Sequence, residues 1–207
     1  MAETKERILD ATAALFQRYG YTGTGLKQIV ANANAPFGSI YHFFPGGKTE
    51  LGEAVIRRSG QMYLELVLGV FEAAGDPVQG VRDIFDGAAA VLQATDYVDA
   101  CPVATVALEV ASSNEPLRQA TAEVFETWIA TAASSFGGGL LDERAARHLA
   151  MVVIELLEGG FVLSRAARST EALDAAGDAA VIVVAAALNG ASRPRRPRRL
   201  RRAPPPP

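Results

Sequence analysis

The stretch that decides the fold is Thr24-Gly-Leu-Lys-Gln-Ile-Val-Ala-Asn-Ala-Asn-Ala-Pro-Phe-Gly-Ser-Ile-Tyr-His-Phe-Phe44. It contains two short amphipathic segments on either side of the junction Asn34-Ala35-Pro36. The first segment has the i, i+3, i+4, i+7 spacing of an apolar helix face, at Leu26, Ile29, Val30 and Ala33. Asn34 falls where the chain must turn, and asparagine tolerates the left-handed backbone conformation better than most residues. The pattern predicts two short helices joined by a tight turn.

The second segment is dense in groups that can contact DNA. Pro36 suits the first turn of this helix, where its missing N–H costs no hydrogen bond. Ile40 and Phe44 are four residues apart and are expected to face inward. Gly38 is a weak helix former, by about 1 kcal/mol relative to alanine, and its small size would let a DNA backbone approach closely. Two helices in this order form the layout of a helix-turn-helix motif, in which the second helix enters the major groove.

The flanking residues predict further helices. Thr24 is expected to cap the first helix of the motif through its hydroxyl. Apolar side chains repeat at helical spacing over residues 4–19, and Gly20 is a good C-terminal stop. After the break at Pro45-Gly46-Gly47, another helix is predicted to begin at Lys48. A lysine there opposes the helix dipole, a cost that a bound phosphate would offset.

Residues 4–58 resemble the DNA-binding domain of the TetR family of transcriptional regulators. The resemblance is carried by the order and spacing of Ile8-Leu9-Asp10-Ala11, Phe16, Gly20-Tyr21, Thr24, Ile29-Val30-Ala31, Gly38-Ser39-Ile40-Tyr41-His42-Phe43-Phe44 and Lys48. The loop Pro45-Gly46-Gly47 and the segment Cys101–Glu109 resemble a lincomycin-resistance repressor-like subgroup. The resemblance implies an all-α homodimer with about nine helices in each chain. It also implies a helix-turn-helix DNA-binding domain at 1–48, followed at 49–190 by a ligand-binding and dimerisation domain.

The resemblance also implies particular contacts with a double-stranded DNA operator. Tyr41 and Lys48 match phosphate-contacting positions, and Thr24 matches a helix cap that touches the DNA backbone. Phe37, Ser39 and His42 match positions that reach base edges or nearby phosphates. The full predicted DNA-binding set is Thr24, Lys27, Pro36, Phe37, Gly38, Ser39, Tyr41, His42, Phe43 and Lys48.

Each predicted DNA contact has an ordinary structural alternative. Tyr41 can lie half-buried against the first helix, Lys27 or Lys48 can be a solvated lysine, and His42 can be an ordinary surface residue. Phe37 and Phe43 can pack on the protein, and for Phe43 packing is the favoured interpretation. The chain also departs from the family pattern, because Asn34-Ala35 replaces the usual Gly-Val of the turn and Phe43 stands where histidine is more common.

The remainder of the chain reads as helices. The last two are apolar over wide faces, and the resemblance predicts that they form the homodimer interface; filling the monomer core is the alternative. In the family a small-molecule effector binds among the middle helices. The candidate wall residues here are Leu66, Phe85, Leu92, Val103, Leu108, Phe125, Trp128 and Met151. Core packing is the alternative for each, and the mixture favours a mostly apolar effector.

Three carboxylates, Glu109, Glu155 and Glu158, lie on or near apolar segments. A buried carboxylate would need a partner, so one of them could receive a cationic or hydroxylated ligand. Surface exposure is the alternative.

Charge is unevenly distributed along the 207 residues. The net charge is +2 over residues 1–58, −12 over 59–192 and +7 over 193–207. A mildly basic end and an acidic body would orient the protein on DNA. The Arg/Pro-rich segment at 191–207 is expected to be a disordered tail. It is either an arm that adds non-specific DNA affinity or an extension without a role.

Other classes of protein fit the sequence less well. No signal peptide and no apolar run of membrane-spanning length is evident, so we expect a cytoplasmic protein with no membrane association. Cys101 is the only cysteine and the chain has two histidines, which disfavours a metal site, and no cofactor is expected. A hydrolase using Cys101 and His148 lacks a glycine-rich elbow and an orienting acid, so no catalytic residue is predicted. A small-molecule carrier that has lost DNA binding is the more serious alternative, and an activator rather than a repressor stays open.

Overall fold

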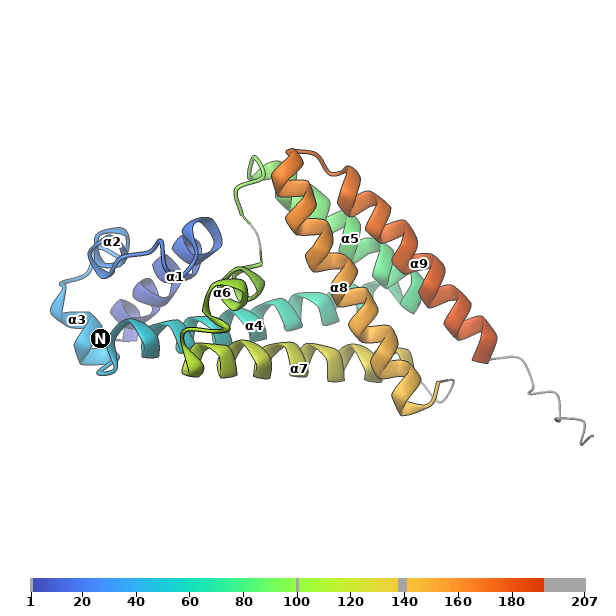
Figure 1. The fold of residues 1–207 in the computed structure, drawn as a ribbon, viewed down its shortest axis with the longest axis horizontal. Coiled ribbons are helices and arrows are strands. Elements are labelled where there is room, and N and C mark those ends of the chain that lie inside the picture. The colour runs from blue at the N-terminus through green and yellow to red at the C-terminus, as the bar shows by residue number, and fades with distance from the viewer. Residues whose placement is uncertain (1, 100, 138–140, 192–207) are drawn as a thin grey trace, which may run out of the picture.

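The computed structural model describes residues 2–99, 101–137 and 141–191. Within these ranges the chain forms helices and no strands (Figure 1). The helices are α1 (Ala2–Tyr19), α2 (Leu26–Asn32), α3 (Gly38–Phe43), α4 (Gly47–Ala74), α5 (Pro77–Ala94), α6 (Pro102–Val110), α7 (Glu115–Gly137), α8 (Glu143–Ala167) and α9 (Glu171–Ala191). The predicted all-α fold of about nine helices is confirmed. The predicted tail lies, from residue 192 onward, outside the described residues.

The molecule is elongated, and α4 links its two ends. Helices α1, α2 and α3 gather at one end, whereas α8 and α9 pack side by side toward the other (Figure 1). With 28 residues, α4 is about 42 Å long. It is continuous across the predicted domain boundary between residues 48 and 49, and it ends at Gly75, whose φ of 66° is left-handed. None of the described helices is long and apolar enough to cross a membrane.

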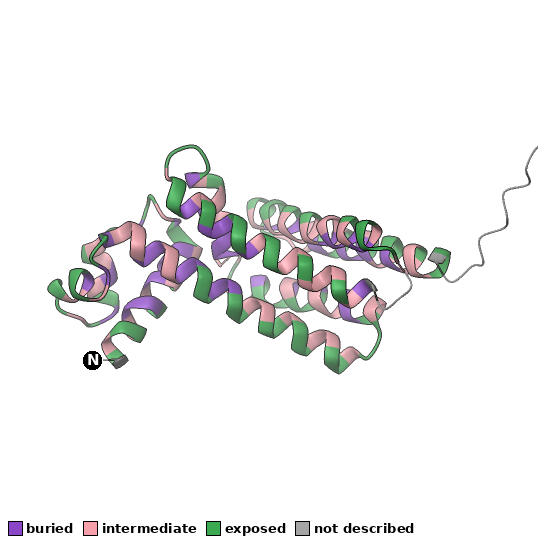
Figure 2. Cartoon of the chain, turned by 90° about the horizontal axis from the view of Figure 1, so that it is seen from below, coloured by how far each residue is buried: buried purple, intermediate pink, exposed green. Residues whose placement is uncertain are grey.

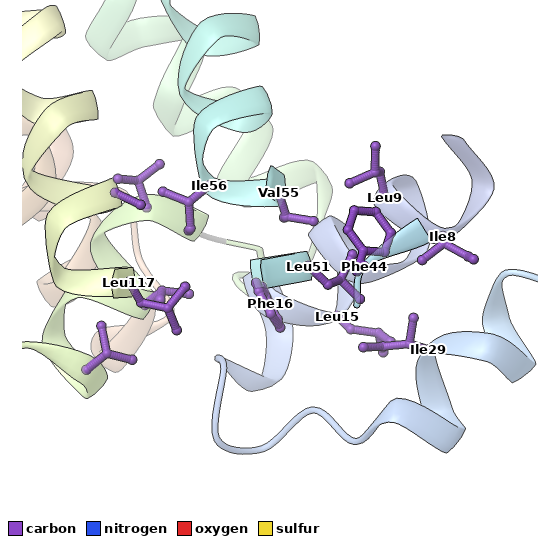
Figure 3. Packing of buried hydrophobic residues seen from close by; sticks show 14 of the residues in the cluster. Ile8, Leu9, Leu15, Phe16, Ile29, Phe44, Leu51, Val55, Ile56 and Leu117 are labelled. Carbon is purple, nitrogen blue, oxygen red and sulfur yellow. The ribbon is translucent and has the colours of Figure 1, made fainter. Parts of the chain in front are cut away.

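The first hydrophobic core lies where α1, α2 and α3 meet α4. Phe16 of α1, Ile29 of α2 and Leu51 of α4 are completely buried, and Figure 3 shows their side chains converging on one interior. Ile40 and Phe44, which were predicted to face inward, are buried in the same core. We call this cluster the N-terminal core. Helices α6 and α7 also contribute to it, so the end formed by α1, α2 and α3 is packed onto the remainder of the chain.

The turn between α2 and α3 is held by a side chain of α1. Asn34 has a φ of 47°, as its predicted left-handed role requires. The Arg7 guanidinium donates to the carbonyl oxygen of Ala33 at 3.0 Å and to that of Asn34 at 3.4 Å. These bonds satisfy carbonyls at the C-terminal end of α2, where a helix lacks its own donors. Arg7 therefore fixes α2 and the turn relative to α1.

The prediction that Thr24 caps α2 is wrong. The cap residue is Gly25, with no side-chain hydrogen bond to the helix. The Thr24 hydroxyl is buried and instead donates to the carbonyl oxygen of Gly20 at 2.7 Å. The Thr24 side chain closes the loop between α1 and α2, because α2 begins one residue later than a Thr24 cap would require.

A second core joins α5, α8 and α9. Phe85 and Leu92 of α5 pack in it with Val153 of α8 and Leu173 of α9. We call this cluster the C-terminal core. Figure 2 shows the buried residues recurring as stripes along the helices, with exposed residues on the opposite faces. The amphipathic patterns in the sequence thus correspond to packed faces.

Close approach between α4 and α7 depends on a glycine. A Cβ atom at Gly60 would lie 2.5 Å from the Val124 side chain, so only glycine permits the observed spacing. The Trp128 indole N–H donates to the Gly60 carbonyl oxygen at 2.9 Å. This bond sets the position of Trp128 between the two helices.

The loop after α1 lies close against α6 at Gly20. The φ of Gly20 is 69°, and an added Cβ atom would lie 1.5 Å from a carboxylate oxygen of Glu109. That carboxylate accepts a hydrogen bond from the backbone N–H of Thr22 at 2.7 Å. The loop after α1 is therefore held by a side chain 87 residues further along the chain.

Substituting Gly20→Ala should destabilise the protein by about 2 kcal/mol, because it combines a left-handed backbone with a steric clash against Glu109. Gly69→Ala is the matched control: Gly69 lies inside α4 with nothing near its would-be Cβ atom, so alanine should stabilise by up to about 1 kcal/mol. Urea unfolding of both variants measures the difference. Equal stabilities would contradict this account of the loop.

Candidate nucleic-acid interface and ligand cavity

The predicted DNA-binding residues divide into three groups by exposure. Lys27, Pro36, Phe37, Gly38, Tyr41 and His42 are exposed. Ser39, Phe43 and Lys48 are half-buried, and Thr24 is buried. The exposed members lie on α2, on the residues that lead into α3 and on α3 itself. We call this exposed group the α3 face.

Two large rings are presented together on the α3 face. Phe37 is 45% exposed and Tyr41 is 51% exposed, and their ring centroids lie 6.1 Å apart. The two neighbouring rings form a small exposed apolar patch, which is suited to contact with another molecule. His42 extends from the same helix, and its ring lies edge-on to the ring of Phe43, with 4.7 Å between the centroids. Phe43 also packs against the N-terminal core, as its favoured interpretation predicted.

Lys48 lies at the start of α4 and is engaged with the protein. Its ammonium is 4.2 Å from the centroid of the Tyr21 ring, a cation–π contact. Burial lowers the pKa of Lys48, and the nearby Glu109 carboxylate opposes that shift. The side chain is half-buried, so its ammonium would contact a phosphate from the edge of the α3 face.

Gly38 is the first residue of α3, and no protein atom lies within 4 Å of its would-be Cβ atom. The protein itself therefore does not require glycine at this position. Space in front of the helix start is what a closely approaching sugar–phosphate backbone would need.

A cavity of about 240 Å³ lies in the body of the molecule. Side chains from α1, α4, α5, α7 and α8, with the segment between α5 and α6, line it. Most of the lining is apolar, including the rings of Phe71, Trp128, Phe136 and Phe161. A concave, mostly apolar space with a few polar groups is the usual form of a small-molecule site.

Polar groups gather at one part of this lining, which we call the polar end: Gln17, Tyr63, Asp99, Cys101 and Glu158. The Gln17 amide donates to the Tyr63 hydroxyl at 2.9 Å, which connects α1 to α4. Burial raises the pKa of Tyr63, with smaller contributions from the charges around it. Asp99 accepts from the Arg18 guanidinium of α1 at 3.1 Å.

Glu158 and Cys101 are the two strongly perturbed groups of the polar end. Burial raises the pKa of Glu158 to about 7, and a hydrogen bond from the Cys101 thiol partly opposes that shift. Burial also raises the pKa of the Cys101 thiol, so it is an unreactive neutral group. Nowhere in the described ranges do three His, Cys, Asp or Glu side chains gather as a metal site would need.

Two of the predicted wall residues, Leu66 and Trp128, line the cavity. The other six do not. Phe85 and Leu92 are buried in the C-terminal core, and Val103 is buried in the N-terminal core. Phe125 packs on the N-terminal core beside Trp128, Met151 is half-buried away from the lining, and Leu108 is 79% exposed.

The cavity lining also includes four polar residues that the sequence did not predict there: Gln17, Tyr63, Asp99 and Cys101. Gln17 and Tyr63 are polar residues on amphipathic helices, where solvent exposure is the default expectation. Glu158 was noticed because it interrupts an apolar pattern, and of the three flagged carboxylates it is the one in the cavity. Glu155 is exposed, and Glu109 holds the loop after α1.

An exposed aromatic face on a helix-turn-helix, carried by a helical body with an internal cavity, defines a helical DNA-binding regulator. Residues 8–55 match the description "Bacterial regulatory proteins, tetR family", and residues 77–179 match "Transcriptional regulator LmrA/YxaF-like, C-terminal domain". The HTH-type transcriptional regulator LmrA of Bacillus subtilis is 32% identical over 171 residues, which cover 83% of this chain and 91% of LmrA. YxaF of the same organism, an HTH-type transcriptional regulator, is 35% identical over 162 residues, which cover 78% of this chain and 85% of YxaF.

The fold is shared with solved structures. A regulatory protein TetR from Rhodobacter sphaeroides superimposes with a TM-score of 0.77 at 21% identity, covering 86% of this chain and 96% of that one. The chain belongs to the TetR family of transcriptional regulators and carries an LmrA/YxaF-like C-terminal domain. Members of this family are DNA-binding regulators rather than enzymes, and they act as dimers on DNA operators.

Gly38→Ala should weaken operator binding at least tenfold, because a methyl group would occupy the space in front of α3. The same change should leave the stability unaltered or raise it by up to about 1 kcal/mol, since alanine is the better helix former. Fluorescence anisotropy with labelled operator DNA, together with urea unfolding, separates the two effects. Gly69→Ala again serves as the control and should bind DNA normally; wild-type affinity in Gly38→Ala would refute the close approach at this position.

Proposed function

We propose that this protein is a ligand-responsive repressor, released from an approximately palindromic operator by a small, mostly apolar molecule. The observation that carries the proposal is that one chain joins the exposed α3 face to an apolar cavity whose lining includes a residue of α1. A carrier without DNA binding would have no use for the two exposed rings of the α3 face.

In this proposal α3 enters the major groove and α2 braces on the DNA backbone. Tyr41 and Lys48 contact phosphates, which position the helix, while Phe37, Ser39 and His42 reach base edges or nearby phosphates. The ring of Phe37 is suited to a thymine methyl group. Lys27 adds a backbone contact from α2, and Gly38 admits the DNA backbone. The buried Thr24 hydroxyl supports the loop before α2 rather than a direct contact.

The dimer forms through α8 and α9 in this proposal. Leu163 of α8 is 61% exposed and Ile182 of α9 is 68% exposed, and the two helices pack side by side (Figure 1). Val162 and Val183 are exposed on the same helices. Four exposed apolar side chains on two adjacent helices are favourably buried against a second copy of the protein. Two recognition helices about 34–36 Å apart would then read two half-sites one DNA turn apart.

Release from DNA follows from a shift between two arrangements of the dimer. A ligand that binds one separation of the recognition helices better than the other changes DNA affinity by that difference in free energy. Contacts that support such coupling run directly from the cavity to α1, through the Gln17–Tyr63 bond and the Arg18–Asp99 ion pair. Helix α4 begins next to the α3 face and lines the cavity further along.

The proposed division of labour is DNA binding by residues 1–48 and ligand binding with dimerisation by 49–190. The site of action is the cytoplasm, where bacterial DNA lies. Repression follows if the operator overlaps a promoter, whereas an operator upstream of it would allow activation. The position of the operator relative to the promoter therefore decides between these two roles.

The DNA-binding proposal is tested by selecting sites from random DNA at a stated salt concentration. A near-palindromic site should emerge. Tyr41→Phe should bind that site about tenfold more weakly, since it loses one hydroxyl contact in each protomer. Lys48→Gln should make the plot of log affinity against log salt less steep by about 1.8, which corresponds to two lost phosphate contacts per dimer.

Arg144→Gln is the matched charge control, because Arg144 is exposed on α8 far along the chain from the α3 face. It should leave the salt dependence unchanged. Recovery of no preferred sequence, or equal salt slopes for Lys48→Gln and Arg144→Gln, would count against the proposed contacts.

The dimer proposal is tested with Ile182→Glu, which places a charge on the exposed apolar face of α9. Sedimentation equilibrium should show a monomer, circular dichroism should show unchanged helical content, and affinity for the full operator should fall at least a hundredfold. The control is Leu108→Glu, which places the same charge on an exposed apolar side chain of α6, outside the proposed interface, and should remain dimeric. A dimeric Ile182→Glu protein would show that another surface joins the protomers.

A further inference from the structure

The cavity has an unbalanced charge. Its lining contains two carboxylates, Asp99 and Glu158, and no Lys, Arg or His among the described residues. Asp99 is paired with Arg18 of α1. Glu158 has no cationic partner within residues 2–99, 101–137 and 141–191. The negative charge of Glu158 is therefore not neutralised by the part of the protein that the structure describes.

Glu158 is also placed where a carboxylate is costly. It lies on α8 between Leu157 and the glycines that precede Phe161, and both Leu157 and Phe161 line the same cavity. Its neighbours at the polar end are Cys101, which donates a hydrogen bond to it, and Tyr63. The Glu158 side chain is partly buried, and holding a carboxylate without a cationic partner in such a place is unfavourable.

We propose that the cavity binds an amphiphilic organic cation, whose ammonium group pairs with the Glu158 carboxylate while its apolar part lies against Trp128 and Phe136. Such a molecule supplies the charge that the lining lacks and covers the apolar surface that makes up most of it. Identifying this cation as the effector rests on the ligand-responsive function proposed above. As a statement about the cavity, it can be tested without DNA.

The probes are three molecules with the same eight-carbon chain: octylamine, octanol and octanoate. The first is a cation near neutral pH, the second a neutral hydrogen-bond donor and the third an anion. Trp128 is the only tryptophan of the chain and lines the cavity, so its fluorescence reports occupancy directly. The wild-type protein should bind octylamine at least tenfold more tightly than octanol, and octanoate most weakly.

The matched variant is Glu158→Gln, which keeps the shape and removes the charge. It should fold, because it relieves an unfavourable burial, and unchanged urea unfolding or a higher midpoint confirms this. Its affinity for octylamine should fall at least tenfold, to the level of octanol, while its affinity for octanol changes less than threefold. The charge preference would then be assigned to this one carboxyl group.

The pH dependence gives a second readout. Because the pKa of Glu158 is about 7, the carboxyl is largely neutral at pH 6 and largely ionised at pH 8. Octylamine should therefore bind several-fold more tightly at pH 8 than at pH 6 in the wild type, and equally at both in Glu158→Gln. The other groups at the polar end are Asp99 paired with Arg18, the Cys101 thiol and Tyr63. The raised pKa values of Cys101 and Tyr63 keep both neutral in this range.

Three outcomes would overturn the proposal: equal binding of octylamine and octanol, a preference for octylamine that survives in Glu158→Gln, or no binding of any probe up to its solubility limit. A preference for octanol would instead indicate a hydroxylated ligand and a protonated Glu158. Adding octylamine to the protein–operator complex tests whether the cation site is also the effector site. Charge-dependent binding without release of DNA would retain the cation site and reject its role as the effector site.

Discussion

The structure depends on α4 belonging to both halves of the molecule. Its first turns are buried in the N-terminal core through Leu51, Val55 and Ile56, beside the helices that would read DNA (Figure 3). Its later turns line the cavity through residues such as Leu66 and Phe71. Helix α4 is therefore a continuous physical connection between the two ends, and the proposed release from DNA would act through it. The direct contacts from α1 to Tyr63 and Asp99 add a second, shorter connection.

The DNA-binding end is also held by contacts with other helices, so it is not an independent domain. Glu109 of α6 holds the loop after α1, and Lys48 lies over the ring of Tyr21, whose hydroxyl shares a hydrogen bond with Thr49 of α4. Arg7 then fixes the turn between α2 and α3. The orientation of α3 is thus set by side chains from three other helices. The proposed mechanism depends on this, because an α3 that rotated independently could not transmit a change in the cavity to the operator.

Local patterns in the sequence predicted the helices and the motif, whereas the cavity depended on contacts that no local pattern contains. Helical spacing predicted which helix faces point inward, and Asn34 and Gly20 predicted where helices end. The structure agrees with each of these predictions. The cap assigned to Thr24 was wrong because α2 begins one residue later. Periodicity shows that a face such as that of Val103 is apolar, but not whether it packs on a core or lines a cavity. Gln17 and Tyr63 were missed because polar residues are expected in water.

The central claim is that occupancy of the cavity changes the spacing of the two DNA-reading helices in the dimer. Asn32 is exposed on α2, so Asn32→Cys can carry a nitroxide label in each protomer, while the buried Cys101 with its raised pKa stays unlabelled. Pulsed electron–electron double resonance then measures the distance between labels with operator bound and with octylamine saturating the Trp128 signal. The account predicts a distribution shifted by several ångströms between the two states. Identical distributions, with Trp128 reporting full occupancy, would contradict it.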